Sequence, residues 1–96
     1  MSLYPSIVMN QEGLSQIKES LIFLLRITSD TNKLAVFLQP HLHRIDNPHL
    51  HHFHNCLQHK ISGFYVFSTV INQIAIDCMT NNALRELMEQ LLHAFS

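Results

Sequence analysis

Apolar residues recur every three or four positions along most of the chain, which is the spacing of one face of an α-helix. In the first such stretch the recurring positions are Leu14, Ile17, Leu21 and Leu24. Taken together, the pattern predicts helices over about residues 11–28, 32–44, 48–67, 70–79 and 82–95. No stretch alternates apolar and polar residues convincingly enough to predict a strand.

Polar residues and prolines indicate where these helices begin and bend. Asp46 or Asn47 can cap the third helix, and Ser68 or Thr69 is expected to cap the fourth. Pro40 falls inside the second helical stretch and should bend or interrupt it, because proline lacks the backbone N–H that the helix would use.

The connections between the predicted helices are short, and the chain has only two glycines and three prolines. Short connections favour antiparallel neighbours. We therefore expect an all-α fold, an antiparallel four-helix bundle with an additional N-terminal helix. With 96 residues, the chain fits one domain over residues 1–96, in which residues 1–10 form a loose lead-in.

Charge and composition exclude several classes of partner. The formal net charge is −1 and charged residues make up 14% of the chain, so no basic field is available to hold nucleic acid or an anionic membrane. No signal peptide is predicted, and Cys56 and Cys78 form no CxxC pattern. We read both cysteines as reduced residues of a cytoplasmic domain.

The third predicted helix carries the candidate chemistry. On a helical wheel His59 lies opposite an apolar stripe made of Leu50, Phe53, Leu57, Ile61 and Phe64. It is flanked on the polar side by His52, Asn55, Ser62 and Gly63. His59 should therefore point into solvent from the middle of a long helix. Gly63 one turn beyond it either opens access to the imidazole or marks a local bend or tight helix contact.

The run from His59 to Gly63, His-Lys-Ile-Ser-Gly, resembles the core of the histidine-containing phosphotransfer family. That family has a histidine, any residue, an aliphatic residue, usually a lysine, and then a glycine. His59, Ile61 and Gly63 match this pattern, whereas Ser62 stands at the lysine position. Thr69 stands where a second glycine is common in the family.

The resemblance implies a helical bundle that carries a phosphoryl group on His59 to or from the aspartate of a receiver domain. The receiver would supply the aspartate and the magnesium ion, so the domain itself needs no cofactor. A neutral imidazole nitrogen is a suitable nucleophile near pH 7. The docking residues expected around His59 are His52, Asn55, Lys60, Ser62 and Gly63.

Seven of the eight histidines lie between His41 and His59, which raises the alternative of a metal site. The pairs His49/His52 and His51/His54 have a spacing that can chelate a metal on one helix face. No carboxylate or cysteine shares that spacing, so we predict no dedicated metal site. The acidic residues are read as helix caps or solvated charges: Asp46, Asp77, Glu86 and Glu89.

A second alternative is a non-enzymatic adaptor that binds a protein partner, since any amphipathic bundle can present a helix face to another protein. A hydrolase or an oxidoreductase is not indicated. The chain has no nucleophile elbow, no phosphate-binding loop and no dinucleotide fingerprint.

Overall fold

The computed structural model describes residues 9–59 and 64–95, with the backbone alone for Phe64 and Tyr65. Over these residues the chain is helical and contains no strand. The elements are α1 (Gln11–Ile27), α2 (Thr31–Leu38), the 3-10 turn η1 (Gln39–His41), α3 (Pro48–Gln58), α4 (Phe64–Asp77) and α5 (Asn82–Phe95). The predicted all-α class is confirmed. Residues 1–8, most of the predicted lead-in, lie outside the described residues.

Four of the helices begin at a side chain that accepts hydrogen bonds from the first turn, as short polar residues commonly do. These cap residues are Asn10 for α1, Asp30 for α2, Asn47 for α3 and Asn81 for α5. Asn47 accepts from two backbone N–H groups, those of His49 and Leu50, each at 3.0 Å. Of the two predicted caps for this helix, Asn47 is the one that forms.

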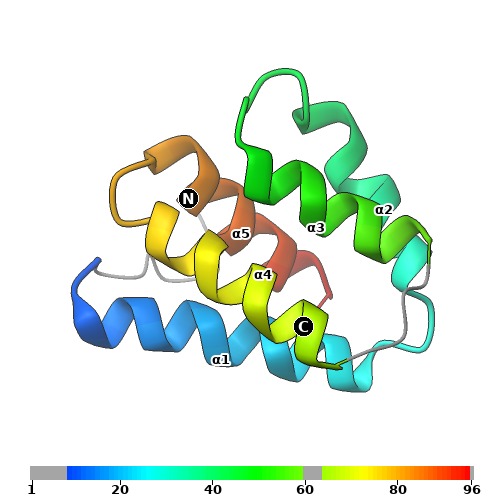
Figure 1. The fold of residues 1–96 in the computed structure, drawn as a ribbon, viewed down its shortest axis with the longest axis horizontal. Coiled ribbons are helices and arrows are strands. Elements are labelled where there is room, and N and C mark those ends of the chain that lie inside the picture. The colour runs from blue at the N-terminus through cyan, green and yellow to red at the C-terminus, as the bar shows by residue number, and fades with distance from the viewer. Residues whose placement is uncertain (1–8, 60–63, 96) are drawn as a thin grey trace.

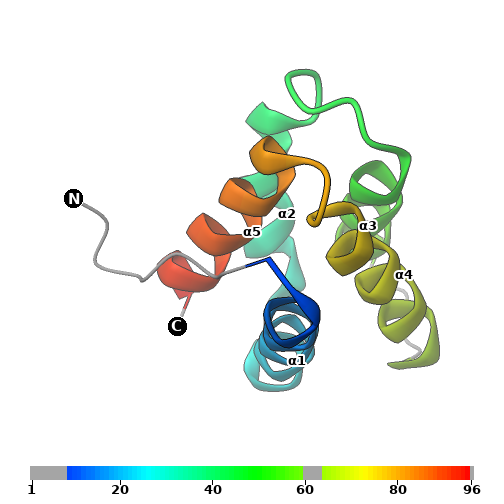
Figure 2. The same ribbon diagram turned by 90° about the vertical axis from the view of Figure 1, so that its left-hand side faces the viewer.

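Figure 1 shows α4 running back across α1 in the opposite direction, with α3 beside it and α5 behind it. Helix α1 packs on α4 and α5, whereas α3 packs on α2 and α4. Figure 2, turned by 90°, separates α5 from the α3–α4 pair on the two sides of α1. Helix α4 is therefore the element that joins α3 to α1.

One continuous apolar core lies among the five helices. Each helix contributes side chains with at most 1% of their surface exposed, including Ile17, Leu38, Leu57, Ile74 and Leu87. The apolar stripes of the sequence therefore mark the faces that turn inward. No helix in the described ranges is long and apolar enough to cross a bilayer.

The expected bend at Pro40 is confirmed. Helix α2 ends at Leu38, and the chain continues as the single turn η1, in which Pro40 is the second residue. A proline cannot donate the backbone hydrogen bond of a continuing α-helix, and the tighter turn accommodates it. The predicted second helix, which was expected to reach about residue 44, is thus shorter.

The predicted boundary between the third and fourth helices is wrong. Helix α3 ends at Gln58 rather than near residue 67, and α4 begins at Phe64. Ser68 and Thr69, expected as caps, lie inside α4. The apolar stripe changes direction in this part of the chain. This change marks the start of α4, which begins earlier in the sequence than the pattern suggested.

Candidate functional site

The exposed face of α3 lies where the sequence predicted it. His52, Asn55 and His59 are exposed. On the opposite side Leu50 and Leu57 are completely buried, and Phe53 is 1% exposed. Ile61, also expected in the buried stripe, lies outside the described residues. Within α3 the helical wheel therefore predicted the exposed and the buried side correctly.

His59 itself occupies a different position from the one expected. It is the residue that caps the C-terminal end of α3, where its backbone N–H donates to the carbonyl oxygen of Asn55 at 3.0 Å. Its backbone has left helical geometry, with φ −91° and ψ 4°. The predicted position in the middle of a long helix is thus wrong, because the helix stops one residue before His59.

The predicted docking surface around His59 included three further residues. Lys60, Ser62 and Gly63 lie outside the described residues. The prediction that Gly63 lies one turn beyond His59 thus falls outside the described residues, and α3 itself ends at Gln58. Of the predicted site, the structure brings together His52, Asn55 and His59.

Other histidines of this region have structural partners. His54 is buried, with 7% of its surface exposed, and hydrogen-bonds to the backbone of Ala35 in α2. Burial lowers the pKa of His54 and outweighs that hydrogen bond, and the neighbouring imidazoles of His51 and His59 lower it further. The Nε2 atom of His51 lies 3.1 Å from the carbonyl oxygen of Leu42.

A polar network at the N-terminal end of α3 joins this helix to the end of α4. The Nδ1 atom of His49 lies 2.6 Å from Oδ2 of Asp77, and the Asn47 side-chain amide donates to the same oxygen at 3.1 Å. Asp77 is the last residue of α4, where the carbonyl ends of the helix disfavour a negative charge. The two donors offset this effect and hold the two helix ends together.

The carboxylate of Asp77 is stabilised in its charged form. Burial alone would raise the pKa of Asp77, but the hydrogen bonds from His49 and Asn47 and the attraction to His49 outweigh burial. The pKa of Asp77 consequently lies below its usual value. An ionised carboxylate only accepts hydrogen bonds, so Nδ1 of His49 is the donor. In the neutral imidazole, Nε2 of His49 then carries the free lone pair.

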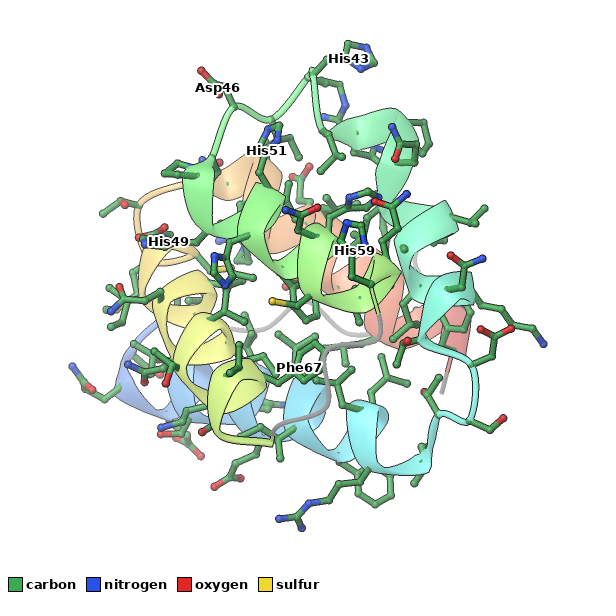
Figure 3. The ribbon with its side chains drawn as sticks, turned by 45° about the vertical axis from the view of Figure 1, so that its right-hand side comes forward. His43, Asp46, His49, His51, His59 and Phe67 are labelled. Atoms are coloured by element: carbon green, nitrogen blue, oxygen red, sulfur yellow. The ribbon has the colours of Figure 1, made fainter. Side chains whose placement is uncertain are left out.

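His49 and His52 both line a pocket of about 310 Å³ between α3 and α4. The α4 side of this pocket is formed by Val66, Thr69, Val70 and Gln73. Figure 3 shows His49 near the start of α3, over α4, and His59 at the other end of the same helix. The pocket and the predicted phosphoacceptor are therefore at different places on α3.

Asp77 is the functional candidate that the sequence missed. It was read as a helix cap or a solvated charge, and this interpretation is wrong, since its carboxylate binds His49 and Asn47. Asp77 and His49 are 28 residues apart in the chain. No local pattern links them, because they meet only when the end of α4 packs beside the start of α3.

The cysteines offer no reactive thiol. Cys56 and Cys78 are both free and buried. Burial raises the pKa of each thiol, that of Cys78 to about 12. A thiol with so high a pKa supplies little thiolate near neutral pH, and the thiolate is the nucleophile and the metal ligand.

The chain matches no family model, no curated protein and no solved structure.

Proposed function

We propose that this domain docks onto a protein partner through the exposed face of α3, formed by His52, Asn55 and His59. One observation carries the proposal: His52 and Asn55 lie on the exposed side of a helix whose other side is fixed in the core by Leu50, Phe53 and Leu57, and the exposed His59 caps the end of that helix. A face held in this way pays little conformational cost on binding, which favours recognition by a partner. The partner that the sequence resemblance points to is the receiver domain of a response regulator or hybrid sensor kinase.

Phosphoryl transfer through His59 is the second candidate. The exposure of the His59 side chain favours it, because a partner can reach the ring without rearranging the core. In the proposed step an imidazole nitrogen of His59 attacks the phosphorus of a receiver aspartyl phosphate. A P–N bond forms as the acyl P–O bond breaks, and the aspartate leaves as a carboxylate. The receiver contributes the aspartate and its magnesium ion.

We also propose that the helices form a four-helix bundle with an additional N-terminal helix, and that the domain is cytoplasmic. The antiparallel course of α4 relative to α1 in Figure 1 supports such a bundle. The end of α3 at Gln58 weighs against the family's layout of a phosphohistidine in the middle of a helix. Docking therefore comes first in the proposal and phosphoryl transfer second.

Docking is tested by titrating the domain with receiver domains, in phosphorylated and unphosphorylated form, by isothermal titration calorimetry. The double variant His52→Ala/Asn55→Ala should weaken binding at least about tenfold, a loss of about 1.4 kcal/mol. His43→Ala is the matched control, because His43 is exposed in the loop before α3. Equal affinity of the double variant and the wild-type domain would overturn the proposed docking face.

Phosphoryl transfer is tested separately by incubation with phosphorylated receiver domains and with phosphoramidate. Label should appear on the wild-type domain, be acid-labile and base-stable, and disappear in His59→Gln. Mapping by mass spectrometry identifies the labelled residue. Label on His49 would show that His59 is not the acceptor. Binding of the receiver without any label would indicate an adaptor that docks but does not accept a phosphoryl group.

A further inference from the structure

His54 differs from the other histidines of α3 because it is buried. Only 7% of its surface is exposed, and its ring hydrogen-bonds to the backbone of Ala35 in α2, a residue that is itself buried. Histidine is the side chain whose charge ordinarily changes between pH 5 and pH 8. The fold therefore places a titratable group inside the contact between α2 and α3.

A second imidazole of α3 bonds to the chain that follows α2. The Nε2 atom of His51 lies 3.1 Å from the carbonyl oxygen of Leu42, the residue that caps η1. At the start of α2 the Thr31 hydroxyl donates to the carbonyl oxygen of Leu57, and this bond involves no titratable group. Protonation of histidines thus acts on the middle and the end of the α2–η1 segment, residues 31–42, whereas its start is bonded independently of pH.

The side chains that act most on the charge of His54 are other imidazoles. His51 precedes it by three residues and His59 follows it by five. Each of them disfavours a positive charge on His54. All three rings take up protons as the medium becomes acidic, so the positive charges accumulate together on the α2 side of α3.

The aspartates of the neighbouring elements have other contacts. Asp30 caps α2, Asp46 is exposed in the loop before α3, and Asp77 of α4 binds His49. The remaining charged or titratable residues of α2 and the turn after it are the exposed Lys33 and His43, and His41, which is bonded to Arg44. His54 therefore takes up its proton within a group of imidazoles, while these aspartates are engaged elsewhere or exposed to solvent.

The direction of the pH effect follows from burial. Burial lowers the pKa of His54 below its ordinary value of 6.5, and His51 and His59 lower it further, which outweighs the hydrogen bond to Ala35. The unfolded chain then binds this proton more tightly than the folded chain does. The stability that depends on neutral His54 is complete above about pH 6.5 and falls as the pH decreases below that value, until the lower, folded pKa is reached.

We propose that the interface between α2 and α3 is a pH-sensitive switch, in which protonation of His54 beside His51 and His59 loosens the α2–η1 segment from α3. The packing of α1 on α4 and α5 should persist, because α1 and α4 contain no histidine and His93 of α5 is exposed. The switch does not depend on the docking or the phosphoryl transfer proposed above.

Amide hydrogen exchange, followed by NMR and expressed as protection factors, tests the switch. Between pH 6.5 and pH 5.0 the protection of the α2 amides should fall about three- to thirtyfold, since each additional proton changes an equilibrium by at most about tenfold per pH unit. At pH 5.0 the α2 amides should be less protected than those of α1 and α4, which open only with the whole domain. Equal protection in α2 and α1 at pH 5.0 would overturn the proposed local opening.

Matched variants assign the effect to one residue. His54→Gln keeps a side-chain amide that can bond to the backbone of Ala35 but does not titrate, so most of the fall in α2 protection should disappear. His51→Gln removes one neighbouring charge and should reduce the fall in part. His43→Gln is the control and should respond like the wild-type domain, because His43 is exposed in the loop. An unchanged pH response in His54→Gln would overturn the proposal.

If circular dichroism shows that His54→Gln is unfolded at pH 7, the wild-type domain decides. The ring resonances of His54 are then followed by NMR as the pH is lowered. Their titration midpoint should lie below pH 6.5. A midpoint at or above pH 6.5 would overturn the proposal, because protonation of His54 would then not destabilise the contact between α2 and α3.

Discussion

The two ends of α3 differ in how their polar groups are satisfied. At the N-terminal end, Asn47 caps the helix, and with His49 it binds Asp77 of α4. At the C-terminal end, Thr31 at the start of α2 donates its hydroxyl to the carbonyl oxygen of Leu57 at 3.0 Å, and His59 follows with an exposed side chain. Among the described residues, the first end has a charged side-chain network and a pocket, whereas the second has the neutral hydrogen bond from Thr31 of α2.

This difference matters for how histidine chemistry is assigned. His49 and His59 are separated by ten residues, about 15 Å along a helix. The sequence resemblance points to His59, whose surroundings in the chain look like a known motif. The structure gives a fixed ring and a carboxylate partner to His49 instead. A residue's chemistry depends on what the fold places beside it, and the four predictions below test how far the two ends differ.

The largest effect is expected at Leu57, which lies next to the exposed end of α3 but is completely buried. Leu57→Ala should lower the free energy of unfolding by about 2–5 kcal/mol, because it removes buried methyl groups and leaves a cavity. Urea denaturation followed by circular dichroism measures the change. A loss below about 0.5 kcal/mol, which is usual for surface sites, would mean that this end of α3 is not anchored in the core.

The next effect concerns the polar network at the other end. Asn47→Ala removes the acceptor for two backbone N–H groups and one donor to Asp77, and should cost about 1–2 kcal/mol. Thr31→Val is the matched variant for the C-terminal end, where one hydrogen bond is lost at about 0.5–1.5 kcal/mol. Equal losses in the two variants would show that the network adds nothing beyond one ordinary hydrogen bond.

Sequence periodicity located most of the fold because burial repeats along each helix. In α1, for example, the recurring apolar positions Ile17, Leu21 and Leu24 are buried, and Leu14 is partly buried against the same core. It failed between α3 and α4, where the pattern predicts a helix that continues to about residue 67, with Gly63 as an access point, a local bend or a tight helix contact, although α3 ends at Gln58. Glycine is unfavourable inside a helix by about 1 kcal/mol, and this was the available signal for a break.

The candidate site was harder to predict than the helices. The exposure of His52, Asn55 and His59 follows from their spacing along the chain, so a helical wheel predicts it. The bond between His49 and Asp77 depends on how the start of α3 meets the end of α4. Tertiary packing brings together these two residues, which are 28 positions apart in the chain, and no spacing rule within a single helix can predict such a contact.

A smaller and pH-dependent effect is expected at Asp77. Its pKa in the folded domain lies below the unfolded value of about 4, so its ionised form stabilises the fold. This contribution is complete above about pH 4 and is lost as the pH falls through the lower, folded pKa. The difference in unfolding free energy between wild type and Asp77→Asn should thus shrink on acidification from pH 6 to pH 2. The carboxylate is partly exposed, so solvent screens the effect.

The decisive measurement for Asp77 is urea denaturation of the two proteins at a series of pH values. Glu86→Gln is the control, since Glu86 is exposed on α5. A difference between wild type and Asp77→Asn that stays constant from pH 6 to pH 2 would show that the charge of Asp77 does not stabilise the junction of α3 and α4.

The smallest effect is expected at His59. The side chain is exposed and lies beyond the last helical residue of α3, and its backbone N–H would still bond to Asn55 in a variant. His59→Gln should therefore change the free energy of unfolding by less than about 0.5 kcal/mol, the usual range for surface substitutions. His49→Gln, by contrast, disturbs the bond to Asp77 and should cost more. If His59→Gln were the more costly of the two, the C-terminal end of α3 would contain an interaction that its exposed position does not explain, and the two ends would no longer differ in the way described.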